Sequence, residues 1–240
     1  MANPMKQFEI RPLVEINIGG FDASFTNSSL FMVIAVSLAT LFLILSMRGR
    51  ALVPGRWQSL AEISYEFIAG MVRDNVGPEG RKFFPFIFTL FMFILFGNML
   101  GMLPYSFTFT SHIIVTFIMA IFVFLGVTIV GFAKHGFKFF GLLLPEGVPW
   151  YIIPVLVPIE LLSYLVRPVS LSLRLFANMT AGHTMLKVFA GFIVTLGFLG
   201  VAPLLIVTAL TGLEFIIAFL QAYVFTILTC IYLNDSLHLH

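Results

Sequence analysis

Charged side chains are scarce in this chain. Asp, Glu, Lys and Arg make up 10% of its 240 residues, against about 25% in a typical globular domain. Hydrophobic residues make up 60%. This composition excludes a water-soluble domain, and a net charge of +2 is too small to indicate nucleic-acid binding. The sequence therefore predicts an integral membrane protein that contacts lipid and binds no nucleic acid.

Cysteine and histidine are also scarce. The single Cys230 excludes an intrachain disulfide framework and a multi-cysteine metal site, and its apolar surroundings favour a packing role. Only His112 and His183 lie near or within apolar segments, which excludes a two-haem bundle with paired axial ligands. There is no nucleotide-binding loop and no repeat of 20–50 residues. We therefore predict no metal and no cofactor, and we place any chemistry inside the membrane.

Apolar runs long enough to cross a hydrocarbon core of about 30 Å divide the chain. Upright transmembrane helices are predicted at residues 30–47, 83–103 and 113–133. Residues 57–76 instead mix charged positions with apolar ones at helical spacing. That pattern is typical of an amphipathic helix on the membrane surface or against a partner. Residues 1–240 are interpreted as a single membrane domain.

Two longer apolar runs follow, at residues 151–200 and 201–233. As one helix, the first run would be about twice as long as a bilayer core is thick. One interpretation is two upright spans with a break near Pro168 or within residues 178–182. The other is a long, strongly tilted helix that packs against the second run in a hairpin. The lack of a turn cluster inside the run favours the hairpin, so the predicted fold is an all-α integral membrane protein.

Basic residues are sorted by position. Eight of the 13 Lys and Arg residues lie in the loops 48–82 and 134–138, and none lies in the turn 104–111. The positive-inside rule therefore places the two basic loops on the cytoplasmic or matrix side. The N-terminus is then expected outside.

Arg174 lies deep in the first long run, with no acidic residue within a turn or two. A guanidinium stays charged in proteins, and placing it in hydrocarbon costs about 2.5–3.5 kcal/mol on insertion scales. A salt bridge to Glu160 would have to span about 21 Å of helix, which no side chain reaches. Arg174 therefore indicates a partner carboxylate, such as one on another subunit, or an ion pathway.

Arg167 could pair with Glu160, seven residues back, or with a lipid headgroup.

Helical spacing sorts the other polar residues of the hairpin. Arg174 and Asn178 share a face, whereas His183 points to the opposite side. Glu214 and Gln221 share a face of the last helix. In an antiparallel hairpin His183 and Glu214 lie at similar distances from the turn, so they could meet. Buried imidazole and carboxyl groups are side chains that carry protons in membranes.

Two segments resemble a known family. The segment 170–183, Ser-Leu-Ser-Leu-Arg-Leu-Phe-Ala-Asn-Met-Thr-Ala-Gly-His, resembles the signature of subunit a of F-type ATP synthases. The segment 98–104, Asn-Met-Leu-Gly-Met-Leu-Pro, is similar to the Asn-x-x-Gly-x-x-Pro turn of the same family. Glu160, Glu214 and Gln221 also fall where the family has such residues. The resemblance covers essentially the whole chain.

The resemblance implies a proton-translocating stator subunit and not an enzyme, because ATP chemistry takes place on other subunits of the complex. The implied partners are a rotating ring of small carboxylate-bearing subunits, the c-ring, and the b-type subunits of a peripheral stalk. Arg174 matches the arginine that separates two aqueous half-channels and prevents a proton short-circuit. His183 and Glu214 match coupled positions in the outer half-channel.

Further positions follow from the same resemblance. Asn178 and Gln221 match polar residues near the arginine, and Glu160 matches a position toward the inner-side exit. At Gly101 some relatives have an acid, so the outer entrance is less clearly defined here. His at 183 with Glu at 214 is the mitochondrial-type order. We expect a bacterial plasma (inner) membrane, with the mitochondrial inner membrane as the alternative.

Two other classes of membrane protein are less well supported. A haem- or quinone-bearing redox subunit would need more intramembrane histidines. A stand-alone secondary transporter would usually show internal repeats with matching helix breaks, and none is visible.

Overall fold

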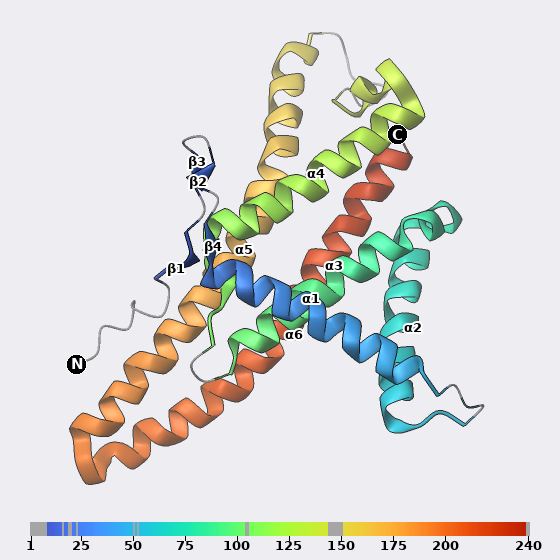
Figure 1. Ribbon diagram of the computed structural model, residues 1–240. Coiled ribbons are helices and arrows are strands. Elements are labelled where there is room, and N and C mark those ends of the chain that lie inside the picture. Colours follow the sequence, from blue (N-terminus) through green and yellow to red (C-terminus); the bar gives the residue numbers. More distant parts are fainter. Residues whose placement is uncertain are drawn as a thin grey trace.

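The structure is a computed structural model that describes residues 9–15, 17–18, 21–22, 24–49, 51, 53–103, 106–143 and 151–238 (Figure 1). Helices make up most of it, and five helices of the described part are long and apolar enough to cross a membrane. The prediction of an all-α integral membrane protein is confirmed. Such a fold satisfies the backbone hydrogen bonds within each helix, as hydrocarbon requires.

Six α-helices follow one another along the chain: α1 Asn27–Met47, α2 Arg56–Val76, α3 Phe84–Gly101, α4 Ile113–His135, α5 Ile153–Leu196 and α6 Val201–Leu237. Short 3-10 segments lie between them: η2 Pro78–Lys82, η3 Phe109–Ser111, η4 Gly136–Leu143 and η5 Gly197–Gly200. Near the N-terminus, β1 (Pro12–Val14) pairs with β4 (Phe25–Thr26), and β2 (Asn17–Ile18) pairs with β3 (Phe21–Asp22), both antiparallel. Sequence reasoning did not find these strands.

Helices α5 and α6 form the predicted long hairpin. The 44 residues of α5 continue without a break through Pro158 and Pro168, so the alternative of two upright spans is wrong. The turn η5 reverses the chain, and α6 runs back antiparallel to α5 (Figure 1). Gly197 in this turn has φ of 55°, a left-handed conformation that glycine adopts without strain.

Helix α2 packs against α1, α3 and α6 through one of its faces. Ile68 and Val72 of that face are buried. Trp57, Leu60 and Ile63 in its first half stay largely exposed, at 72%, 55% and 64%, although the Trp57 ring lies 6.4 Å from that of Phe42 in α1. The helix thus has one buried face and, in its first half, apolar side chains that stay largely exposed.

All six helices contribute to the core of the bundle, and α3 and α6 contribute the most residues. Phe91 and Ile94 of α3 and Phe225 of α6 are buried in it. Cys230, the only cysteine, is fully buried in the same cluster. Its place agrees with the packing role expected from sequence.

Contacts at one end of the bundle join segments that are far apart in sequence. The Lys134 ammonium at the end of α4 donates to the Glu79 carboxylate of η2, and this hydrogen bond lowers the pKa of Glu79. His135 Nε2 donates to the Leu237 carbonyl at 3.0 Å. The ends of α4 and α6 and the η2 segment therefore lie together.

Arg167 ties α5 to α6. Its guanidinium donates to Asp235 at 2.9 Å, and both side chains are 27% exposed. The guanidinium also lies over the rings of Tyr164 and Tyr232, 5.5 and 5.0 Å from their centroids. The two partners considered for Arg167 from sequence, Glu160 and a lipid headgroup, are replaced by Asp235, because the hairpin brings residues 68 positions apart together.

Replacing Arg167 by Ala should lower the free energy of unfolding by about 1.5–3 kcal/mol, the range for a hydrogen bond to a charged group. The exchange variant Arg167→Asp/Asp235→Arg should recover part of that loss. The measurement is equilibrium unfolding of the purified chain in mixed micelles of increasing SDS content. Arg73→Ala is the control, because its pair with Asp74 is 80% and 70% exposed and such pairs contribute little. If both variants lost the same free energy of unfolding, the Arg167–Asp235 pair would not stabilise the contact between α5 and α6.

Candidate functional site

Two ionisable side chains meet between α5 and α6. His183 Nδ1 lies 3.5 Å from Glu214 Oε1, and the side chains are 10% and 3% exposed. Neither carboxyl oxygen of Glu214 has a hydrogen-bond partner among the described residues. The pair is thus an imidazole and a carboxyl group that face each other with little access to anything else, a geometry that suits passage of a proton between them.

Glycine at position 182 makes this contact possible. A Cβ atom added there would lie 2.3 Å from Glu214 Oε1, which is closer than real atoms approach. Glu214 can therefore reach His183 only because the preceding residue has no side chain. The Gly182-His183 dipeptide of the sequence motif therefore provides both the space for the Glu214 carboxyl group and the imidazole that faces it.

The connection between α3 and α4 covers the pair from the other side. Thr108 Oγ1 lies 3.1 Å from His183 Nε2. Thr180 of α5 donates from its hydroxyl to the Ser111 carbonyl at 3.1 Å, which fixes η3 on α5. Both ring nitrogens of His183 therefore have a polar neighbour, Glu214 at Nδ1 and Thr108 at Nε2.

The buried face of α6 carries Glu214 toward α3. Asn98 Nδ2 donates to the Ala218 carbonyl at 3.2 Å, and Asn98 is fully buried. Gln221, two turns after Glu214, is 8% exposed. Asn98 therefore acts in helix packing, while its carbonyl oxygen, like the Glu214 oxygens, has no partner in the described part. Pro104, which completes the turn motif that begins at Asn98, lies outside the described residues.

Arg174 differs from the residues above. It is exposed on the surface of α5, and within the described residues it makes no ion pair and no hydrogen bond. Asn178, one turn later, is half-buried, and so is Glu160 near the start of the helix. His183 is buried, in agreement with its predicted place on the opposite side of α5 from Arg174. The structure thus brings together His183 and Glu214, and it keeps Arg174 away from both.

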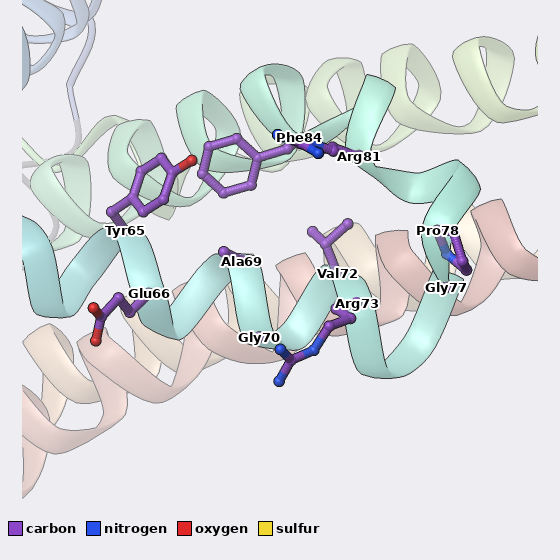
Figure 2. A pocket seen from close by; sticks show the side chains of 10 residues that line it. All are labelled: Tyr65, Glu66, Ala69, Gly70, Val72, Arg73, Gly77, Pro78, Arg81 and Phe84. Atoms are coloured by element: carbon purple, nitrogen blue, oxygen red, sulfur yellow. The ribbon is translucent and has the colours of Figure 1, made fainter.

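A cavity of about 950 Å³ lies elsewhere, between α2, η2 and α3 (Figure 2). Tyr65 and Phe84 line it with ring centroids 4.7 Å apart. Glu66 and Arg73 of α2 also line it (Figure 2). No described side chain of α5 or α6 lines the cavity, and His183 and Glu214 are not among its lining residues.

Sequence reasoning missed two residues of these arrangements. Thr108 lies in a turn that was noted only for its lack of charge, although its four serine and threonine residues (Ser106, Thr108, Thr110, Ser111) were a usable signal. Asp235 lies at the end of the last apolar run, and a search for an acid opposite Arg167 in the hairpin register would have found it. Among the described residues there is no group of three or more His, Cys, Asp and Glu side chains that could hold a metal ion.

Five membrane-crossing helices with a buried His–Glu pair between the two longest define a multi-pass integral membrane protein. Residues 29–234 match the family model described as ATP synthase A chain. Proteins named ATP synthase subunit a are 61% identical over 247 residues in Paramagnetospirillum magneticum and 60% over 241 residues in Rhodospirillum rubrum, with both chains covered completely in each case. The protein of that name from Rhizobium etli is 57% identical over 246 residues, covering 99% of this chain and 98% of that protein.

The chain belongs to the ATP synthase subunit a family. The resemblance noted in the two sequence segments is confirmed, and the similar proteins named above come from bacteria. Members of this family are membrane subunits of ATP synthases.

Replacing Gly182 by Ala should reduce ATP-driven proton pumping by an ATP synthase that contains this chain. The added methyl group displaces the Glu214 carboxyl group from His183, and displacements on this scale slow reactions by about tenfold or more. Gly191→Ala on the same helix is the matched control, since a Cβ there meets nothing within 4 Å. The measurement is acidification of vesicles with the assembled complex. Equal pumping by the two variants would show that the close approach at Gly182 is unimportant.

Proposed function

We propose that this chain is the proton-translocating stator subunit of an F-type ATP synthase. It provides two aqueous half-channels to the carboxylates of a rotating ring, and Arg174 prevents a proton short-circuit between them. The observation that carries the proposal is Arg174 itself, a permanent charge exposed on a long membrane helix without a partner in the described chain. A charge in that place is expensive unless a carboxylate from another subunit meets it.

The buried pair supplies the outer half-channel. A proton from the outer side passes through His183 and Glu214, which hold and release it, and then neutralises a ring carboxylate. The neutral carboxyl group travels around the ring through lipid. It loses its proton toward the inner side, and the resulting carboxylate is attracted to Arg174. Each charge that crosses releases about 2.3 kcal/mol per 100 mV, which turns the ring.

Three further residues have supporting roles in the proposal. Asn178 lies one turn from Arg174 and is half-buried, so its amide suits orientation of the guanidinium or of water beside it. Gln221 lies on the buried face of α6 that carries Glu214. Glu160 is half-buried near the start of α5, where it suits a place on the inner-side exit path.

The proposed partners and orientation follow from exposed features. Arg174 faces the ring of carboxylate-bearing subunits. The largely exposed apolar residues Trp57, Leu60 and Ile63 of α2, together with α1, suit the b-type subunits of a peripheral stalk. The basic loops 48–82 and 134–138 lie on the cytoplasmic side of a bacterial plasma (inner) membrane, with the N-terminus outside.

Replacing Arg174 by Ala should abolish ATP-driven proton pumping and leave passive proton leak unchanged or raised, because the charge that blocks protons between the half-channels is lost. Both quantities are measured on the assembled complex in vesicles, the leak under an imposed potential. Arg73→Ala is the control, since it removes an exposed arginine outside the membrane helices. Normal pumping by the Arg174→Ala complex would refute the proposed role of the guanidinium.

Replacing Glu214 by Gln should slow proton pumping by about 100-fold, the scale of losing a general acid–base group. The exchange variant His183→Glu/Glu214→His should retain more pumping than Glu214→Gln, because it keeps one imidazole and one carboxyl group in contact. Pumping is followed as vesicle acidification, and Glu66→Gln on α2 is the control for loss of an exposed carboxylate. If Glu214→Gln pumps as well as Glu66→Gln, Glu214 does not carry protons.

A further inference from the structure

The hydroxyl group of Thr108 has two polar neighbours. Its Oγ1 donates to the Gly101 carbonyl at 3.3 Å and lies 3.1 Å from His183 Nε2. Gly101 is the last residue of α3, and its carbonyl is one of those that a helix end leaves without an intrahelical partner. Thr108 is 6% exposed and His183 is 8% exposed, so water has little access to either group.

The number of protons decides the direction of these hydrogen bonds. A threonine hydroxyl has one proton to donate, whereas a neutral imidazole carries its proton on one of two nitrogens. Both contacts of Thr108 are hydrogen bonds only if its proton points to the Gly101 carbonyl and His183 Nε2–H donates to Oγ1. The Ser106 hydroxyl lies 3.1 Å from the same Gly101 carbonyl but 2.7 Å from the Leu103 carbonyl, so its single proton points to Leu103 and Thr108 is left to pair with Gly101. Buried polar groups are nearly always paired, which favours this assignment.

The other ring nitrogen is then left with a lone pair. With the proton on Nε2, the unprotonated Nδ1 faces Glu214 Oε1 at 3.5 Å. In the opposite tautomer, an Nδ1–H group would face the carboxyl group and could not accept a proton from it. The tautomer therefore decides whether a protonated Glu214 can pass its proton to His183.

We propose that Thr108 is a positioning residue for proton transfer, which holds His183 in the Nε2-protonated tautomer so that Nδ1 accepts a proton from Glu214. This inference rests on the proposed role of the pair in proton translocation. In the transfer, the Glu214 O–H bond breaks and an N–H bond forms at Nδ1. A neutral pair becomes an imidazolium beside a carboxylate, and the return of the proton restores the neutral pair.

The fold holds Thr108 closely in this place. A Cβ atom at Gly101 would lie 2.6 Å from Thr108 Oγ1, so the hydroxyl occupies space that only glycine leaves free. Ser111 donates from its side chain to the Thr108 carbonyl at 2.5 Å, and Thr180 fixes Ser111 on α5. The turn and His183 are therefore held by the same helix.

The test uses three variants in the assembled complex. Thr108→Val keeps the shape of the side chain and removes the hydroxyl, Thr108→Ser keeps the hydroxyl and removes the methyl group, and Thr110→Val is the matched control. Thr110 is fully buried in the same turn, and its hydroxyl has no hydrogen-bond partner in the described part. Passive proton flux under an imposed potential should fall about two- to tenfold in Thr108→Val, the range for losing one net hydrogen bond. Thr108→Ser and Thr110→Val should match the unmodified chain.

A second measurement reads the tautomer directly. Solid-state NMR of the complex with ¹⁵N-histidine in this chain should show His183 with a protonated Nε2 and a bare Nδ1, and a mixture of tautomers in Thr108→Val. The His183→Gln spectrum assigns the signal.

A protonated Nδ1 in the unmodified chain would overturn the inference. A defect in Thr108→Ser with normal flux in Thr108→Val would overturn it as well, because that is the pattern of a packing role. Loss of flux in Glu214→Gln without any effect of Thr108→Val would refute only the role of Thr108, whereas normal flux in Glu214→Gln would refute the proposed function as well.

Discussion

The close packing of α5 against α6 is the interaction on which the rest of the structure depends. It brings His183 and Glu214, 31 positions apart in the chain, within 3.5 Å of each other, and it pairs Arg167 with Asp235 near the opposite end of the hairpin. Both contacts need the helices at short range, and at Gly182 the missing side chain permits it. Because no turn interrupts α5, its polar residues keep fixed angular positions over more than ten turns.

The two arginines of α5 show how one helix uses the same side chain in different ways. Arg167 has a carboxylate at 2.9 Å and aromatic rings beside its guanidinium, so its charge is compensated within the chain. Among the described residues, Arg174, seven positions later, has no ion-pair partner and no ring beneath its guanidinium, and it lies on the surface. A membrane protein that needed both only for stability would compensate both. The contrast between them is the strongest sign that the surface around Arg174 meets a partner.

Much of this structure could be predicted because it follows from patterns within single segments of the sequence. Apolar length indicated the helices and the hairpin. Helical spacing placed His183 opposite Arg174, and the distances from the hairpin turn placed it near Glu214. The N-terminal strands were missed because they contain two or three residues each, too few for an alternating pattern. Thr108 and Asp235 were missed for another reason. Their contacts with α5 span 75 and 68 positions, so they do not follow from helical spacing within one segment and need the register between segments.

The burial of Cys230 has a practical consequence. The chain contains one thiol, that of Cys230. It is fully buried in the core of the bundle, where water-soluble maleimides do not reach it. The natural sequence can therefore receive cysteines one at a time without prior removal of its own. Reaction of such thiols with charged reagents would map which faces of α5 and α6 meet water, residue by residue, on an otherwise unmodified background.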